Sequence, residues 1–284
     1  MNVSAKTKQL GIIGYPVEHS FSPKMHNFIS SFLGNDYIYS GWRVAPENVG
    51  AAIAGIRALG IRGVNVTAPH KTAVMEHLDE ITADARKLGS VNTIVNDNGF
   101  LRGYNTDAEG FYRALTAQSI EIKDAKILVL GAGGVVKPTL TRLIWENPKE
   151  ITVLNRTKEK AVALSNALRA DTGFEIKTEL TSLDFDIVIN TTSAGMEPQE
   201  DALPIDAICE LDSLDFINEN TAVVDMIYNP DETLFLKEAK KRGAKTMNGL
   251  GMLIYQGLIA YELFTGTTLP PDMAEIVKRE VFGR

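Results

Sequence analysis

The sequence predicts an α/β fold with two α/β domains, and three observations support this prediction. Short apolar strands alternate with helices along the chain, which is typical of a mostly parallel sheet covered by helices. Two apolar runs at 91–95 and 100–104 flank an Asn-Asp-Asn-Gly turn, which indicates a hairpin and one local antiparallel pair. A glycine-rich turn at 131–134 follows a strand and opens a helix, which predicts a second, Rossmann-like domain.

The first domain is expected to begin with a strand and a helix. The apolar run 10–14 is the strand, and Ser22-Pro23 opens the helix, because serine is a favourable N-cap and proline is tolerated in the first turn. A further strand is expected at 63–67, ending before Pro69.

A helix beginning at Thr106-Asp107-Ala108-Glu109 is expected to lead into the second domain, because this run matches the capping-box pattern. Beyond it the chain alternates strands and helices in a doubly wound pattern and ends in two helices. The expected strands are 126–130, 151–154, 186–190 and 222–225. Two later helices are expected to end near 147 and 169, and three more are expected at 233–242, 250–264 and 272–282.

Composition narrows the class of protein. A net charge of −7 over 284 residues argues against nucleic-acid binding, since no basic stripe is available to neutralise phosphates. A single cysteine, Cys209, fits a reducing compartment. No run of about 20 apolar residues predicts a membrane span, and the first residues lack a signal-peptide pattern, so we expect a cytoplasmic protein. The four histidines, at 19, 26, 70 and 77, form no metal-ligand set, so no metal site is predicted.

The glycine-rich turn Gly131-Ala132-Gly133-Gly134 is typical of a dinucleotide site. Its glycines allow the backbone to approach a pyrophosphate, which lies at the N-terminus of the following helix. The usual third glycine is absent, and Val136 stands in its place. The alternative is a strand–helix turn in a domain that binds no nucleotide.

The residues after the next strand favour NADP over NAD. A carboxylate there would bind the ribose hydroxyls of NAD and repel a 2′-phosphate, whereas this chain has Asn155-Arg156-Thr157. Arg156 offers a planar cation for adenine and phosphate, and Thr157 and Lys160 add donors.

Lys71 and Asp107 are the candidate acid–base pair. Lys71 is expected in the first turn of a helix after Pro69, and Asp107 in the first turn of another, where the macrodipole favours a negative charge. Asp107 would orient Lys71 and bind a substrate hydroxyl, while Lys71 would exchange a proton with the substrate. The alternatives are an exposed lysine and an ordinary acidic residue at a helix start.

Ser20 and Ser22 are candidates for holding a substrate carboxylate, since two hydroxyls would lie beside a helix N-terminus. From spacing alone, Ser22 as an N-cap and Ser20 as a loop residue is the stronger interpretation. Met252 and Tyr255 are expected to be core residues before they are ligand contacts.

Taken together, the chain closely resembles the shikimate/quinate dehydrogenase family. Nine motifs carry the resemblance in order, and as a set they are highly specific; they lie at 14–27, 65–71, 90–93, 104–107, 131–134, 155–157, 190–196, 228–230 and 249–256.

The resemblance implies NADPH-dependent reduction of 3-dehydroshikimate to shikimate, in the pathway to aromatic amino acids. It implies a substrate-binding domain of residues 1–107 plus 248–284 and an inserted NADP-binding domain of residues 108–247. The implied substrate-binding residues are Ser20, Ser22, Asn65, Thr67, Asn92, Asp107, Tyr228 and Gln256, with Lys71 as the acid–base residue. The implied cofactor-binding residues are Gly131, Ala132, Gly133, Gly134, Val135, Asn155, Arg156, Thr157, Lys160, Thr191, Met226, Gly249 and Met252.

The chain departs from the family pattern after the glycine turn. Val135-Val136-Lys137-Pro138 replaces the usual small residues and arginine, so Lys137 keeps the charge without the fork of a guanidinium group.

Three rival functions stay open. A relative that also oxidises quinate or uses NAD is the nearest, followed by a non-catalytic metabolite-binding relative. The third is a different small NADP enzyme, such as a methylene-tetrahydrofolate dehydrogenase, against which the paired serines and Gln256 argue. The sequence does not distinguish a monomer from a homodimer.

Overall fold

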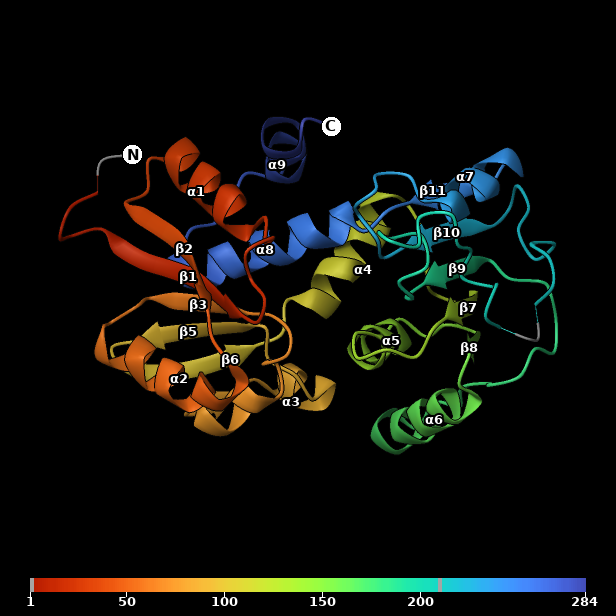
Figure 1. Cartoon of the computed structure of the whole chain (residues 1–284), viewed down its shortest axis with the longest axis horizontal. Coiled ribbons are helices and arrows are strands. Elements are labelled where there is room, and N and C mark those ends of the chain that lie inside the picture. Colours follow the sequence, from red (N-terminus) through yellow and green to blue (C-terminus); the bar gives the residue numbers. More distant parts are fainter. Residues whose placement is uncertain (1–2, 209–210) are drawn as a thin grey trace. The chain divides into compact units, whose positions relative to one another are not determined.

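The computed structural model describes residues 3–208 and 211–284, so Cys209 lies outside the described residues. The chain divides into two compact units (Figure 1). The first unit comprises Met1–Gly110 with Ile254–Arg284, and the second comprises Phe111–Leu253. The two boundaries fall within helix α4, Asp107–Ala117, and helix α8, Leu250–Thr265.

The first unit contains a six-stranded sheet with the strand order β2-β1-β3-β5-β6-β4. Strand β5 is antiparallel to both of its neighbours, whereas β1–β2, β1–β3 and β4–β6 are parallel pairs. The predicted hairpin is therefore confirmed as β5–β6, although the sheet has one more antiparallel pair than expected. The strands are β1 Lys8–Gly14, β2 Tyr37–Arg43, β3 Gly63–Val66, β4 Glu80–Ile81, β5 Thr93–Asp97 and β6 Phe100–Tyr104.

Both faces of this sheet are covered, which explains why the central strands β3 and β5 are almost continuously buried. One face packs Ile13, Val64 and Val66 against α2, and the other packs Leu10 and Ile12 against Phe264 of α8. The helices of this unit, besides α4 and α8, are α1 Ser22–Leu33, η1 Pro46–Asn48, α2 Val49–Ala58, η2 Ala73–His77, α3 Ala83–Leu88 and α9 Met273–Phe282.

The second unit contains a five-stranded, fully parallel sheet with the order β11-β10-β9-β7-β8. The strand order reverses at β7, so the carboxyl end of β7 is a topological switch point, where ligands of such sheets bind. The strands are β7 Lys126–Leu130, β8 Glu150–Leu154, β9 Ile187–Asn190, β10 Ala222–Asp225 and β11 Lys245–Met247. The helices are α5 Val136–Ile144, α6 Lys158–Thr172 and α7 Leu234–Lys241.

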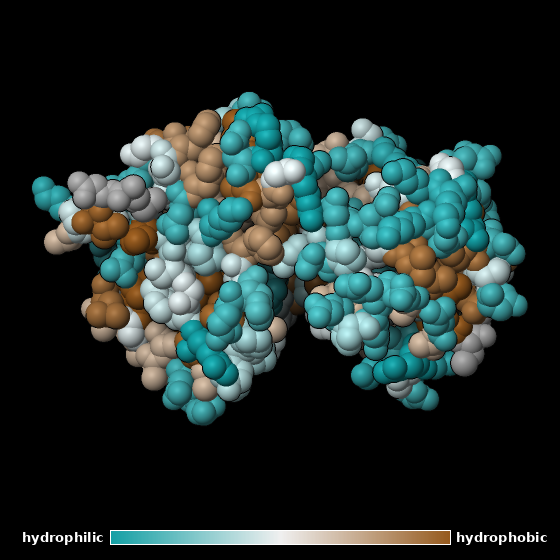
Figure 2. All heavy atoms as spheres, turned by 45° about the horizontal axis from the view of Figure 1, so that its top comes forward, coloured by the Kyte–Doolittle hydropathy of each residue, from teal (hydrophilic) through white to brown (hydrophobic). Residues whose placement is uncertain are grey.

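The described surface is mainly polar. On the face drawn in Figure 2, hydrophilic residues cover most of the area and apolar residues gather in small areas between them. Among the described residues, no helix combines the length and apolar character that a membrane crossing requires. Within 3–208 and 211–284, no group of three or more histidine, cysteine, aspartate or glutamate side chains has the arrangement of a metal site.

Candidate active site

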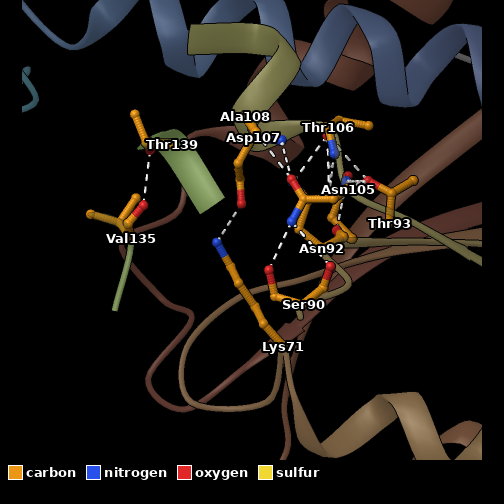
Figure 3. A network of polar contacts seen from close by, with 11 residues as sticks. Lys71, Ser90, Asn92, Thr93, Asn105, Thr106, Asp107, Ala108, Val135 and Thr139 are labelled. Carbon is orange, nitrogen blue, oxygen red and sulfur yellow. Dashed lines mark hydrogen bonds and ion pairs between the residues drawn. The ribbon is translucent and has the colours of Figure 1, made fainter. Parts of the chain in front are cut away.

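Lys71 and Asp107 form a direct ion pair in the first unit. The Nζ atom of Lys71 lies 2.6 Å from Oδ2 of Asp107 (Figure 3). The side chains are 34% and 17% exposed, so both groups are ordered by the contact and still reached by solvent. An ammonium group held by a carboxylate at a solvent-accessible position can exchange a proton with a bound ligand.

The expected helical position of Lys71 is wrong. Lys71 lies in a turn before the 3₁₀ helix η2, which begins at Ala73. Its backbone carbonyl accepts a hydrogen bond of 2.8 Å from the N–H of Val91, instead of serving as a helical acceptor. This bond ties the Lys71 backbone to the segment just before β5, which fixes where the lysine side chain starts.

Asp107 is the first residue of α4, so the predicted helix start is confirmed. The Oδ1 atom of Asn105 accepts the N–H groups of Asp107 and Ala108, at 3.1 and 3.3 Å, and satisfies the first backbone donors of the helix. The Nδ2 atom of Asn105 donates to the hydroxyl and carbonyl of Ser90.

A buried amide–hydroxyl network lies beside the ion pair (Figure 3). The Oδ1 atom of Asn92 accepts the N–H of Thr106 at 2.7 Å, and its Nδ2 atom donates to the Thr106 hydroxyl at 3.0 Å. The Thr93 hydroxyl donates to Asn92 and accepts from Nδ2 of Asn65 at 3.0 Å. Each of these side chains is buried, so the satisfied hydrogen bonds hold Asn65 and Asn92 in fixed orientations.

Ser20 and Ser22 lie together at the start of α1. The Ser20 hydroxyl accepts the N–H of Ser22 at 3.2 Å. The N-cap position is Phe21, which makes no side-chain cap bond, so the expectation that Ser22 caps the helix is wrong. Ser22 is the first helical residue, and its side chain is buried.

The other predicted substrate residues fall in both units. Thr67 directly follows β3, and Gln256 lies on α8 in the first unit, whereas Tyr228 lies in the second unit. A Cβ added to Gly110 would stand 2.6 Å from the backbone nitrogen of Gln256, so glycine permits the close approach of α4 to α8. Burial raises the pKa of Tyr228 above its usual value.

The glycine-rich turn lies at the carboxyl end of β7. Gly131 has a φ of +111°, a backbone conformation that favours glycine. A Cβ there would also stand 2.5 Å from the oxygen of the Thr191 hydroxyl. This hydroxyl donates a hydrogen bond to the carbonyl of Leu130. Both observations explain why this position is glycine, and they place Thr191 against the turn.

A cavity of about 380 Å³ opens beside this turn within the second unit. Asn155 forms part of its wall: its Oδ1 atom accepts the N–H of Ala132 at 3.1 Å, and its Nδ2 atom donates to the carbonyl of Thr157 at 2.8 Å. Eight of the predicted cofactor residues line the cavity, namely Gly131, Ala132, Gly133, Asn155, Arg156, Thr157, Lys160 and Thr191. The rest of the wall was not predicted to bind the cofactor and consists of Thr192, Ser193, Ala194, Gln199, Ala202, Leu203, Pro204, Asp206, Ala207 and Ile208.

The remaining predicted cofactor residues are not in that cavity wall. Gly134 and Val135 continue the turn into α5. Gly249 donates its N–H to the carbonyl of Ile227 at 2.9 Å, and a Cβ on it would overlap the Met226 carbonyl. Met252, on α8, is half-buried.

Asp225, which the sequence analysis did not single out, joins the two loops that follow β9 and β10. Its fully buried carboxylate accepts from Asn190 Nδ2, from the N–H of Ile227 and from the Thr233 hydroxyl, at 3.0, 3.0 and 2.7 Å. Burial raises the pKa of Asp225 above its usual value, against these three hydrogen bonds. Asn190 in turn accepts the N–H of Thr192 at 2.9 Å, so the carboxylate fixes the loop that carries Thr191.

Lys137, which follows the glycine turn, has a structural role. It forms an ion pair of 2.7 Å with Asp171 of α6. Lys137 therefore links α5 to α6.

The chain matches three family models along its length. They are the shikimate dehydrogenase substrate-binding domain at residues 12–94, shikimate/quinate 5-dehydrogenase at residues 114–198, and the shikimate 5′-dehydrogenase C-terminal domain at residues 249–281.

Individual relatives match over nearly the whole chain. A curated NADP⁺-dependent shikimate dehydrogenase of Methanocaldococcus jannaschii is 44% identical over 289 residues, covering 99% of both chains. A crystal structure of a shikimate dehydrogenase with NADP⁺ has a TM-score of 0.89 at 42% identity, covering 99% of this chain and 97% of the other. The shikimate 5-dehydrogenase of Thermus thermophilus, solved with NADP(H) and shikimate, has a TM-score of 0.83 at 34% identity, covering 96% and 99%.

A 5-ketofructose reductase of a Gluconobacter strain is also similar, with a TM-score of 0.85 at 31% identity and coverage of 96% and 98%. The fold is thus shared with a reductase named for a different ketone. The three matching models and the full-length relatives nevertheless agree, and the chain belongs to the shikimate dehydrogenase family.

Proposed function

We infer that the chain catalyses the reversible, NADP-dependent interconversion of 3-dehydroshikimate and shikimate, a step in aromatic amino-acid biosynthesis. Family membership supports the reaction, and the relatives solved with NADP⁺ or shikimate support its two ligands. The observation that carries the inference is the 2.6 Å contact between the Lys71 ammonium and the Asp107 carboxylate.

Lys71 would act as the acid in ketone reduction. The reaction converts C=O to CH–OH, so it needs a hydride at carbon and a proton at oxygen. NADPH, when bound, supplies the hydride, and Lys71 gives the proton to the developing alkoxide. In the direction of oxidation, the neutral amine takes the proton back from the substrate hydroxyl.

Asp107 would keep Lys71 in place and accept a substrate hydroxyl. One of its oxygens accepts from Lys71, and the carboxylate has further lone pairs for a ligand. Because α4 begins at Asp107 and is capped by Asn105, the carboxylate stands on a rigid element.

The substrate would be held by hydroxyl and amide groups of the first unit. Ser20 and Ser22 stand at the N-terminus of α1, where partial positive charge favours a carboxylate. Asn65 and Asn92 present oriented amides beside the ion pair, and we propose Thr67 and Gln256 as further contacts. Tyr228 is proposed as the contact from the second unit.

The second unit fits a phosphorylated dinucleotide. A Cβ on Gly133 or Gly134 would meet nothing within 4 Å, so open space adjoins the turn where a pyrophosphate would lie. Arg156 and Lys160 line the same cavity and supply two cations for a 2′-phosphate. We propose Gly134, Val135, Thr191, Met226, Gly249 and Met252 as the remaining contacts with the cofactor.

One cysteine in 284 residues is compatible with a reducing compartment, which supports a cytoplasmic location.

Light scattering on the purified chain decides between a monomer and the homodimer that the sequence left open.

A substrate and cofactor panel tests the function. Initial rates at 340 nm are measured with shikimate or quinate and with NADP⁺ or NAD⁺, and in the reverse direction with 5-ketofructose and NADPH. We expect the highest kcat/KM for shikimate with NADP⁺. Turnover dominated by quinate or 5-ketofructose would contradict the assigned substrate, and absence of turnover with every pair would indicate a non-catalytic binding protein.

A further inference from the structure

Tyr39 contacts one of the predicted substrate residues and has no role in the function proposed above. It is on β2, it is buried, and its hydroxyl donates to Oδ1 of Asn65 at 2.7 Å. This hydrogen bond ties the phenol group to a residue of β3 that is proposed to bind the substrate.

The strand order shows that this connection is long-range. Strand β1 lies between β2 and β3, so Asn65 is not on a strand that pairs with that of Tyr39. The tyrosine side chain therefore extends across β1, over Leu10 and Ile12, which belong to the same apolar cluster as Tyr39. A shorter side chain at position 39 could not reach Asn65.

Two adjacent residues of α1 fix Tyr39 itself. The side chain of Asn27 bonds both the N–H and the carbonyl of Tyr39, each at 2.9 Å. The ring of His26 stacks on the tyrosine ring, with centroids 4.3 Å apart and an angle of 6° between the planes. Helix α1 therefore holds both the backbone and the ring of Tyr39.

The Asn65 amide is held in one orientation, and the Tyr39 hydroxyl stabilises it. The Nδ2 atom of Asn65 donates to the Thr93 hydroxyl at 3.0 Å and to the Asn92 carbonyl at 3.3 Å. Because this carbonyl can only accept, the amide nitrogen must face it, and Oδ1 then faces the Tyr39 hydroxyl, which donates to it. Burial raises the pKa of the Tyr39 hydroxyl well above its usual value, so it stays a donor at neutral pH. One lone pair of Oδ1 is left to accept a substrate hydroxyl.

We propose that Tyr39 is a positioning residue for the substrate, which holds the Asn65 amide in the orientation that binds a hydroxyl of shikimate. The inference rests on the proposed function, because it assumes that Asn65 contacts that substrate. Its effect is on binding: a preorganised amide loses less freedom when the ligand arrives. The proton transfer by Lys71 does not depend on it.

The test is Tyr39→Phe, which removes only the hydroxyl. We expect the KM for shikimate to rise about tenfold while kcat falls less than about threefold, since a lost buried hydrogen bond has an effect of this order. The KM for NADP⁺ should stay within about twofold of the wild-type value, because the cofactor residues lie in the second unit.

Tyr261→Phe is the matched control. Tyr261 is a fully buried tyrosine of the first unit whose hydroxyl donates to Ser30 and accepts from Asn35, neither of which is proposed to bind the substrate. Both variants lose one buried hydroxyl, so both should lower the melting temperature. Only Tyr39→Phe should raise the KM for shikimate, whereas a purely structural role would leave the KM values of both variants unchanged.

Thr93→Val keeps the proposal testable if Tyr39→Phe does not fold. It removes the other side-chain partner of Asn65 and leaves Tyr39 intact, so it should also raise the KM for shikimate. An unchanged KM in either folded variant overturns the inference while the proposed function stands. Failure of the wild-type chain to turn over shikimate overturns both.

Discussion

Replacing Lys71 with alanine removes the ammonium group and leaves the carboxylate of Asp107 unpaired. The ion pair is partly exposed, at 34% and 17% for the two side chains, so its loss costs about 0–1 kcal/mol of folding stability. The loss of proton transfer lowers kcat by about 10²–10⁴, or about 3–5 kcal/mol in activation free energy. The expected increase in activation free energy is therefore several times larger than the expected loss of folding stability.

The assay is the initial rate at 340 nm with saturating shikimate and NADP⁺, accompanied by titration of NADPH into the protein. Lys71→Ala should lower kcat by this factor and leave the Kd for NADPH nearly unchanged. Lys71→Met keeps an aliphatic side chain of similar length without the ammonium group, and it should have the same effect. Lys177→Ala is the control, because its 2.6 Å ion pair with Glu150 is comparable and lies in the second unit, outside the cavity wall. If Lys71→Ala keeps more than about a tenth of wild-type kcat, the acid–base role is misassigned.

Three further predictions concern other parts of the chain. Arg156→Ala should raise the KM for NADP⁺ about tenfold or more and raise that for NAD⁺ much less, because only NADP⁺ carries the 2′-phosphate that the guanidinium is proposed to bind; equal effects on both would refute this role. Burial lowers the pKa of His26 to about 3, so between about pH 6.5 and pH 3 this histidine takes up a proton when the protein unfolds. The free energy of unfolding should therefore decrease as the pH is lowered through this range, by up to about 1.4 kcal/mol per pH unit. In urea titrations His26→Phe should remove this dependence, and the same pH dependence in the variant and the wild type would disprove the assignment. Gly131→Ala should lower the free energy of unfolding by about 1–3 kcal/mol, measured by thermal unfolding without cofactor, because φ is positive and the new Cβ would meet the Thr191 hydroxyl. Gly134→Ala should lower it less, because a Cβ there meets nothing within 4 Å. Equal losses in the two variants would contradict the strain argument.

Much of the fold could be predicted because its strands are short apolar runs with clear ends. The runs at 126–130 and 151–154 became β7 and β8 within a residue, since both are buried in a parallel sheet. Strand β2 was not predicted, because Tyr37–Arg43 mixes aromatic, polar and charged residues at a sheet edge. The three-residue β11 was missed as well, being too short for a periodic signal.

The candidate site was predictable where a motif carries the chemistry locally, and less so where it depends on long-range contacts. Lys71 and Asp107 were expected to meet, and they do. Tyr39 and Thr93 act through partners on other strands, so no spacing in the sequence indicates them. Asp225 ends a strand that was predicted, and the only signal was a carboxylate directly after three buried apolar residues.

The start of α1 could be predicted, but not the side chain that satisfies its backbone donors. The helix begins at Ser22, and its N-cap position is Phe21, which makes no side-chain cap bond. The Ser20 hydroxyl accepts the N–H of Ser22, so a residue two positions before the helix satisfies its first donor. At the start of α4, Asn105 likewise accepts the N–H groups of the first two helical residues. Rules that look for one capping hydroxyl at the helix boundary do not consider side chains just outside it, which explains why both helix starts were placed correctly and these contacts were not predicted.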